Sequence, residues 1–163
     1  MACNLSGHKY RSVSNPESGY ENSLAFGFKM TNQDPDLRQG KRVLICDDEP
    51  RTRQALKTLL LTREITCNVE PSSMISVVGE ARDGCEAVQL VKAFLPEVVV
   101  IDACMPGMDG LAATRLIKKN WPQIRVVVLT MYADQRQAAL AAGADTFLMK
   151  GCLAETLFEA ILA

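Results

Sequence analysis

The sequence contains no hydrophobic run long enough to cross a bilayer. A spanning helix needs roughly 18 consecutive apolar residues, and the 48% of hydrophobic residues in this chain are divided into shorter runs. Residues 1–20 also lack the apolar stretch of a secretory signal peptide. We therefore expect no membrane partner and a cytoplasmic location. The net charge of −1 provides no basic footprint for direct binding to nucleic acid.

Histidine is scarce, and paired cysteine motifs are absent. The only histidine is His8, in a polar stretch where a lone histidine is more often solvated than functional. The six cysteines form no CxxC pair and are irregularly spaced, so neither a zinc site nor a disulfide framework is expected. We expect free and mostly buried thiols.

The composition changes sharply near residue 40. Residues 1–40 are rich in Ser, Asn, Gly and charged residues and have no sustained hydrophobic period, which predicts a disordered or loosely docked extension. Within it, only a short segment at Leu24–Met30 could pack on a domain. Residues 41–163 are predicted to form that domain.

Apolar runs alternate with helical periods after residue 40, which predicts a parallel sheet covered on both faces. The strands are apolar throughout, as burial on both sides requires, so we predict an α/β fold with an open, doubly wound sheet. Thr62–Met74 is predicted to be an extended surface loop. The expected strands are Lys41–Cys46, Ile75–Ala81, Glu97–Asp102, Ile124–Thr130 and Asp145–Met149, and the expected helices are Glu49–Thr62, Asp83–Phe94, Gly110–Asn120, Asp134–Ala142 and Leu153–Leu162.

Polar residues stand where four of these strands end. Asp47 and Asp48 follow the first strand, Asp102 ends the third, Thr130 ends the fourth, and Lys150 follows the fifth. In doubly wound sheets the functional groups gather beyond the carboxyl ends of the strands. Clustered carboxylates repel one another unless a cation offsets them. We therefore expect one crevice that holds a hard divalent cation.

Mg²⁺ suits this donor set because it takes one or two carboxylates and keeps several waters. Asp48 and Asp102 are candidate direct ligands, Asp47 a ligand through water, and the backbone carbonyl of Cys104 is a further candidate. The alternative is that the paired aspartates only cap the following helix.

A carboxylate beside Mg²⁺ can attack phosphorus and form an aspartyl-phosphate, which makes Asp102 the candidate phosphoacceptor. Lys150 could neutralise a phosphoryl oxygen, and the Thr130 hydroxyl could donate to another. Taken singly, these two residues could equally be a solvated lysine and an ordinary β-branched strand residue.

Four segments resemble the receiver domain of two-component response regulators over roughly residues 41–163: VLICDDE, VVVIDACMPGMDG, VVVLTMYAD and AGADTFLMKG. The resemblance implies a flavodoxin-like (βα)5 fold with strand order 2-1-3-4-5. It implies phosphorylation of Asp102, Mg²⁺ at the two preceding aspartates Asp47 and Asp48, and phosphoryl contacts from Thr130 and Lys150. It also makes the aromatic residue three before the lysine, Phe147, the expected switch residue.

The resemblance further implies a sensor histidine kinase or phosphotransfer protein as partner and homodimerisation on phosphorylation. The output surface would be helix 134–142, strand 145–149 and helix 153–162. Residues 130–151 are similar to the NarL/FixJ subfamily, in which a DNA-binding domain follows the receiver. Transcriptional control would then act through a domain outside this sequence, and the chain would be either a stand-alone receiver or part of a longer regulator.

Two departures from the family pattern stand near the site. Gly151 replaces the common proline and removes the expectation of a cis peptide bond, and Cys104 borders the approach of water to phosphorus. A phosphatase of the haloacid-dehalogenase type is disfavoured because it would need an aspartate at position 104. We expect no enzyme beyond help with the domain's own phosphorylation and dephosphorylation. An interaction module without phosphorylation stays an alternative.

Overall fold

The computed structural model describes residues 40–66 and 74–163, which form a five-stranded parallel sheet in the order β2-β1-β3-β4-β5. The predicted strand order is therefore confirmed. The predictions for residues 1–39, including His8 and Leu24–Met30, lie outside the described residues. The strands are β1 (Lys41–Cys46), β2 (Ile75–Ala81), β3 (Val98–Ile101), β4 (Arg125–Thr130) and β5 (Thr146–Met149).

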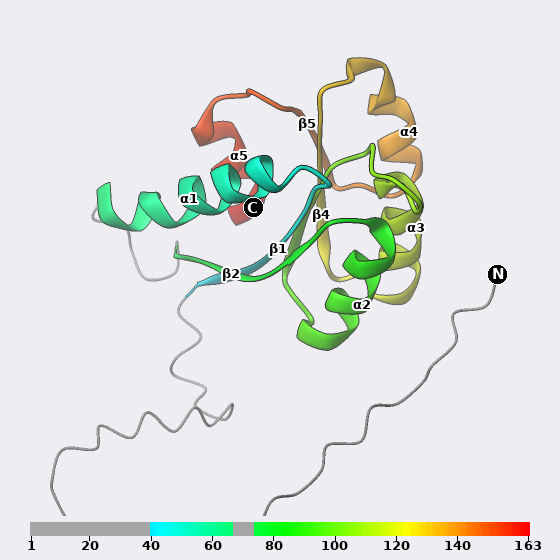
Figure 1. Ribbon diagram of the computed structural model, residues 1–163, viewed down its shortest axis with the longest axis horizontal. Coiled ribbons are helices and arrows are strands. Elements are labelled where there is room, and N and C mark those ends of the chain that lie inside the picture. Colours follow the sequence, from blue (N-terminus) through cyan, green and yellow to red (C-terminus); the bar gives the residue numbers. More distant parts are fainter. Residues whose placement is uncertain (1–39, 67–73) are drawn as a thin grey trace, which may run out of the picture. The chain divides into compact units, whose positions relative to one another are not determined.

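Helices cover both faces of the sheet, as the doubly wound fold requires. Figure 1 shows α1 and α5 on one face and α2, α3 and α4 on the other. Among the described residues, no helix combines the length and the apolar character needed to cross a membrane. The helices are α1 (Pro50–Thr66), α2 (Gly84–Phe94), α3 (Gly110–Asn120), α4 (Arg136–Ala141) and α5 (Ala154–Leu162), with a 3-10 turn at Ala133–Gln135 before α4.

The central strands are buried on both faces. In β1, Val43 and Ile45 belong to the core beneath α1 and α5, whereas Leu44 and Cys46 belong to the core beneath α2, α3 and α4. This alternation follows from the two-residue period of a strand. Each fully buried aliphatic side chain contributes roughly 1.5–3 kcal/mol relative to an exposed one, so the apolar runs hold the strand ends at fixed positions.

Two element boundaries differ from the sequence prediction. The first helix begins at Pro50, a favoured residue at the first helical position, and continues to Thr66. Residues 62–66 are therefore helical rather than part of the predicted loop, and residues 67–73 lie outside the described residues. The predicted helix 134–142 instead begins with the 3-10 turn at Ala133–Gln135, and α4 proper ends at Ala141.

The expectation of buried thiols is wrong for two cysteines. Cys46 is buried in the sheet, but Cys85 and Cys104 are exposed, and Cys152 is partly buried. Cys85 lies in the first turn of α2, and Cys104 lies in the loop after β3, where its neighbours Ala103 and Met105 are buried but its own side chain is exposed. All four described cysteines are free.

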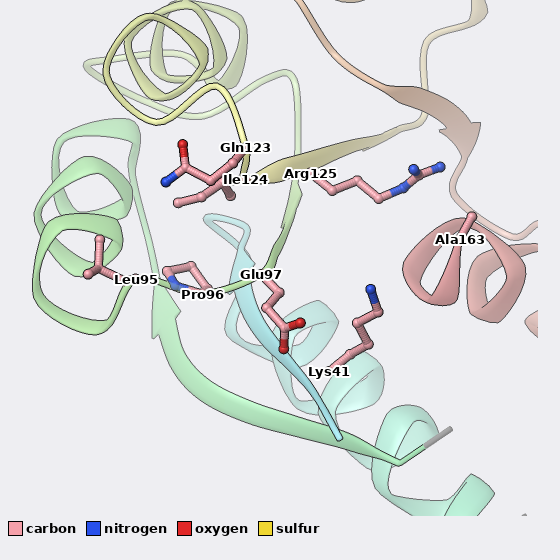
Figure 2. Close-up of a pocket in the computed structure, with 8 residues that line it drawn as sticks. All are labelled: Lys41, Leu95, Pro96, Glu97, Gln123, Ile124, Arg125 and Ala163. Atoms are coloured by element: carbon pink, nitrogen blue, oxygen red, sulfur yellow. The ribbon is translucent and has the colours of Figure 1, made fainter. Parts of the chain in front are cut away.

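A shallow pocket lies at the opposite end of the sheet from the predicted site (Figure 2). It gathers around the amino ends of β1, β3 and β4, whereas the clustered carboxylates follow the carboxyl ends of β1 and β3. None of its lining residues is a predicted site residue, so it is not the predicted crevice. The lining residues are Lys41, Leu95, Pro96, Glu97, Gln123, Ile124, Arg125 and Ala163.

Candidate functional site

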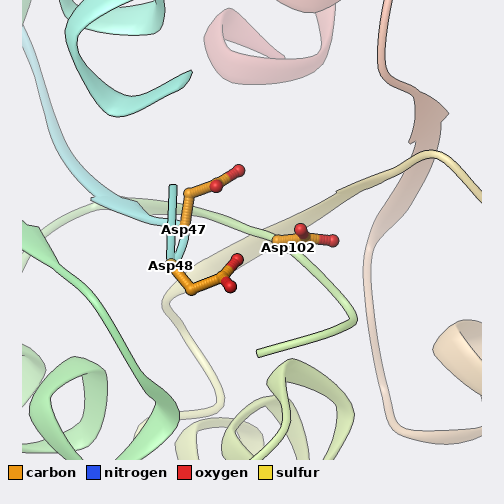
Figure 3. Close-up of side chains that lie close together, drawn as sticks. All are labelled: Asp47, Asp48 and Asp102. Atoms are coloured by element: carbon orange, nitrogen blue, oxygen red, sulfur yellow. The ribbon is translucent and has the colours of Figure 1, made fainter. Parts of the chain in front are cut away.

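Strand pairing brings the predicted carboxylates together. Cys46 at the end of β1 pairs with Ile101 at the end of β3, so the residues that follow, Asp47 and Asp102, leave the sheet side by side. The Asp102 backbone N–H donates to the Cys46 carbonyl at 2.8 Å. Carboxylate oxygens of Asp47, Asp48 and Asp102 lie within 4.8 Å of one another, and Figure 3 shows the three side chains reaching into one space.

Local hydrogen bonds fix the two buried carboxylates in the same way. Asp47 Oδ1 accepts from the N–H of Glu49 at 3.0 Å, and Asp102 Oδ1 accepts from the N–H of Cys104 at 3.2 Å. Aspartate commonly forms this bond to the backbone two residues ahead, because it closes a turn. Each aspartate therefore points its other oxygen, Oδ2, toward the interior of the site.

Lys150 bridges these two oxygens. Its Nζ lies 2.6 Å from Asp102 Oδ2 and 2.7 Å from Asp47 Oδ2. Burial lowers the pKa of Lys150, but the hydrogen bonds to Asp102 and Asp47 outweigh that effect, so its pKa is raised overall. The ammonium is therefore charged throughout the neutral range, and it holds together two carboxylates whose residues are only 7% and 1% exposed.

The summed charge of the three carboxylates and Lys150 suits a divalent cation. Three carboxylates and one ammonium give this group a formal charge of −2. Asp48 is exposed, so the cluster opens to solvent on its side. Oxygen donors in a partly open, negatively charged cluster are the chemistry that Mg²⁺ prefers, and the residues present fit that ion.

Arg53, which the sequence pattern did not single out, supports the acidic loop. Arg53 Nη1 donates to the backbone carbonyls of Asp47 at 2.7 Å and Asp48 at 3.3 Å. Its position early in the helix that follows the paired aspartates was the available signal. Arg53 therefore holds the backbone of the loop through its carbonyls, and these hydrogen bonds do not involve the carboxylates.

The alternative that the paired aspartates only cap α1 is not supported. The Asp47 carboxylate is bonded to the N–H of Glu49, which precedes the helix. It is Glu49 Oε1 that accepts from a first-turn amide, the N–H of Arg51, at 3.3 Å. Capping at this end therefore falls to the glutamate, and the aspartates face the site.

Thr130 and Phe147 lie on the same face of the sheet. Phe147 packs against the core beneath α2, α3 and α4, and it pairs with Val128, a member of that core. Thr130 lies two residues beyond Val128, so the strand period places it on the same side. Its side chain is fully buried, and its Oγ1 accepts from the N–H of Tyr132 at 3.3 Å. Its carbonyl accepts from the N–H of Lys150 at 2.8 Å.

The loop after Asp102 contacts the start of α4 through a second residue that the sequence did not reveal. Gln135 Nε2 donates to Cys104 Sγ at 3.0 Å. Within residues 40–66 and 74–163, the one buried side-chain polar atom without a hydrogen-bond partner is Gln135 Oε1. The contact joins residues 31 positions apart, and no local sequence pattern reports such a pairing.

Gly110 keeps the chain close behind the site. A Cβ at this position would collide with the Asp102 carbonyl oxygen. The Gly110 N–H donates to the Ala103 carbonyl at 2.9 Å, and Asp109 caps α3 by accepting from the N–H of Ala112 at 2.6 Å. The loop between Asp102 and α3 is therefore fixed at both ends.

Comparison with known proteins places this chain in a family. Residues 43–162 match the response regulator receiver domain. The response regulator protein VraR of Staphylococcus saprophyticus is 34% identical over 122 residues, which cover 74% of this chain and 54% of VraR. The chain therefore spans about half the length of the curated relatives that it matches.

Solved structures agree with this match. The receiver domain of the putative response regulator NarL from Mycobacterium tuberculosis has a TM-score of 0.66 and 31% identity, covering 76% of this chain and 94% of that one. A chain of the CheX-CheY-BeF3-Mg²⁺ complex from Borrelia burgdorferi has a TM-score of 0.63 and 25% identity, covering 75% and 87%. The resemblance inferred from the sequence is confirmed: the chain belongs to the response regulator receiver domain family.

Proposed function

We propose that this receiver takes a phosphoryl group onto Asp102 from a sensor histidine kinase or a phosphotransfer protein. The observation that carries the proposal is the position of the Asp102 carboxylate. It is nearly buried, it is oriented by a backbone N–H, and it lies 2.6 Å from the Lys150 ammonium at the edge of an acidic cluster. An oriented carboxylate beside fixed positive charge is suited to attack phosphorus.

The transfer needs little covalent chemistry from the protein. A carboxylate oxygen of Asp102 bonds to phosphorus as the bond from phosphorus to the donor's imidazole nitrogen breaks, and the electron pair stays on that nitrogen. Lys150 already contacts Asp102 Oδ2 and can follow the negative charge onto a phosphoryl oxygen. The Thr130 hydroxyl donates to a second phosphoryl oxygen. Positioning and charge neutralisation account for most of the rate in phosphoryl transfer.

Asp47, Asp48, Asp102 and the backbone carbonyl of Cys104 would hold Mg²⁺ at this site. When bound, the ion neutralises charge on phosphoryl oxygens that would otherwise be repelled by three carboxylates. Two observations support the assignment: the net charge of −2 in the cluster, and the similar chain solved in a complex with BeF3 and Mg²⁺.

Movement of Thr130 and Phe147 would carry the conformational change from the phosphorylation site to the surface of α4, β5 and α5. Turning the Thr130 hydroxyl toward a phosphoryl group breaks its bond with the N–H of Tyr132 and vacates space on the α4 face of the sheet. Phe147 is only partly buried on that same face and can turn inward to fill the space. The surface of α4, β5 and α5 would change as a result, and homodimerisation on phosphorylation would use it.

The effect that phosphorylation has on other molecules is proposed from the relatives. The chain spans about half the length of the curated relatives that it matches. One of the similar chains is described as a two-component response regulator of the LuxR family from Aurantimonas sp. SI85-9A1, with 30% identity and a TM-score of 0.63. Control of transcription in the cytoplasm, through a DNA-binding domain outside this sequence, fits that relationship. The second candidate, an interaction receiver without phosphorylation, is disfavoured because Asp47, Asp48, Asp102, Thr130 and Lys150 are all present.

Incubation with Mg²⁺ and acetyl phosphate, followed by intact mass measurement, tests the phosphoacceptor. We expect one phosphoryl group on the wild-type chain and none after EDTA treatment. Asp102→Asn should abolish the addition. Asp109→Asn is the matched control, since asparagine also caps helices and Asp109 serves α3 from the same loop. An unmodified wild-type chain, or full modification of Asp102→Asn, would contradict the proposal.

A further inference from the structure

Arg53 lies where a cation is unfavourable for the helix itself. It belongs to the first turn of α1, which begins at Pro50 and has no acidic residue in that turn. The positive end of the helix dipole lies there and disfavours basic side chains. The Arg53 side chain is nevertheless only 17% exposed, so contacts outside the helix must hold the guanidinium in place.

The guanidinium holds the peptide group between Asp48 and Glu49, which in turn holds the Asp47 carboxylate. A trans peptide group is planar, and its carbonyl and N–H point in opposite directions. At this peptide group the carbonyl accepts from Arg53 Nη1 at 3.3 Å, and the N–H donates to Asp47 Oδ1 at 3.0 Å. Arg53 therefore orients a candidate metal ligand through one rigid group.

The second bond of the guanidinium fixes the backbone between the paired aspartates. Arg53 Nη1 donates to the Asp47 carbonyl at 2.7 Å, and this carbonyl belongs to the peptide group that precedes the Asp48 side chain. The Asp47 N–H donates to the Ala81 carbonyl of β2 at 3.0 Å. Arg53 therefore also restricts the directions in which the Asp48 side chain can leave the loop.

A glutamate on the neighbouring strand anchors the guanidinium. Glu80 Oε2 lies 3.7 Å from Arg53 Nε, and Glu80 Oε1 lies 2.8 Å from Lys57 Nζ. Glu80 belongs to β2 and pairs with Ile45 of β1, so its backbone is fixed by the sheet. Arg53 therefore links the loop of the paired aspartates to the sheet.

We propose that Arg53 makes the site selective for Mg²⁺ over Ca²⁺ by holding the loop of Asp47 and Asp48 in one geometry. This inference rests on the proposed binding of Mg²⁺ at the acidic cluster. Arg53 acts on the ligands of the ion and not on the ion, and it is therefore a positioning residue.

The coordination chemistry of the two ions explains why a fixed loop would discriminate between them. Mg²⁺ demands near-ideal octahedral geometry at roughly 2.0–2.1 Å, whereas Ca²⁺ takes about 6–8 oxygen ligands at roughly 2.3–2.6 Å in flexible arrangements. A loop that keeps its carboxylates in place favours the ion with the stricter geometry. A loosened loop can adjust to the larger ion, so loss of Arg53 should weaken Mg²⁺ binding more than Ca²⁺ binding.

The positive charge of Arg53 acts on affinity in the opposite direction. A nearby guanidinium repels any divalent cation, so removal of its charge alone would strengthen the binding of Mg²⁺ and Ca²⁺ to a similar degree. Because the two ions carry the same charge, this contribution cancels in the ratio of their dissociation constants. The ratio therefore reports the geometry of the loop.

Calorimetric titration of the full chain without a phosphodonor, at constant ionic strength, measures both dissociation constants. The wild type should bind Mg²⁺ more tightly than Ca²⁺. Arg53→Met should lower this preference about tenfold, roughly the factor that one hydrogen bond to a charged group supplies. Arg53→Lys keeps the charge and a donor and should retain part of the preference. Glu80→Gln keeps Arg53 but weakens its anchor, and it should lower the preference less than Arg53→Met does.

Lys57→Met is the matched control, because it removes the other cation beside Glu80 and should keep the wild-type preference. Urea unfolding in EDTA checks that each variant is folded before it is titrated. If Arg53→Met does not fold, the milder variants Arg53→Lys and Glu80→Gln carry the test.

The outcomes distinguish this inference from the proposed function. A wild type that binds neither ion would overturn the Mg²⁺ assignment and the role of Arg53 together. A wild type that binds Mg²⁺ without preference over Ca²⁺, or an Arg53→Met variant with the wild-type preference, would overturn the role of Arg53 and leave the Mg²⁺ assignment intact. An equal loss of preference in Lys57→Met would assign the effect to the charges around Glu80 and also overturn that role.

Discussion

Removal of the Lys150 ammonium should destabilise the fold in a way that Mg²⁺ reverses. In Lys150→Met, the carboxylates of Asp47 and Asp102 would remain side by side without their shared cation, in residues that are 1% and 7% exposed. Loss of one partner from a buried ion pair typically costs 3–5 kcal/mol. The Lys150 side chain is 18% exposed, which places the expected loss at the lower end, about 3 kcal/mol.

Urea unfolding in EDTA, and again in excess Mg²⁺, measures this loss. Lys57→Met is the matched control, because Lys57 Nζ also contacts a carboxylate oxygen, that of Glu80, at 2.8 Å, but its side chain is 40% exposed. An exposed pair of this kind contributes roughly 0–1 kcal/mol. Mg²⁺ should restore much of the stability of Lys150→Met and leave Lys57→Met unchanged. Equal losses for the two variants, or no response to Mg²⁺, would refute the electrostatic account of the site.

Three further predictions concern neighbouring residues. Gly110→Ala should lower the free energy of unfolding by roughly 1–3 kcal/mol in urea denaturation, because the new Cβ meets the Asp102 carbonyl. A loss below about 0.5 kcal/mol, which is typical of neutral surface changes, would contradict this. Thr130→Val should still be phosphorylated, but phosphorylation should no longer shift the NMR amide resonances of β5. Shifts as large as those of the wild type would argue against a switch through Thr130 and Phe147. Maleimide should label exposed Cys104 in the folded chain much faster than Cys46, because burial raises the pKa of the Cys46 thiol; comparable rates would count against the described core.

Much of the fold was predictable because it depends on local pattern. The strand prediction matched all five strands to within one residue at either end. In the three central strands the continuous apolar run matches burial on both faces. The site residues followed from the strand ends, because parallel strands bring their carboxyl ends to one edge. That edge carries all five predicted residues: Asp47, Asp48, Asp102, Thr130 and Lys150.

What was not predictable depends on contacts between distant residues. Residues 62–66 have the polar composition of a loop, but α1 continues through them to Thr66. Helix propensity is a weak guide to where a helix ends. Cys104 is exposed between the buried residues Ala103 and Met105, and composition does not report which side chain of the loop faces solvent. The contact of Gln135 with Cys104 needs the relative placement of α4 and the loop after β3, and it involves two residue types that carry no recognisable motif.

The central claim is that the phosphoryl group resides on Asp102 and on no other carboxylate. Borohydride reduces an aspartyl-phosphate to homoserine but leaves free carboxylates unchanged, so reduction after loading, followed by peptide mapping, locates the modified residue directly. We expect homoserine at position 102 alone, in a reaction that requires Mg²⁺. Homoserine at position 47, 48 or 109, or no reduction of a fully loaded chain, would contradict it.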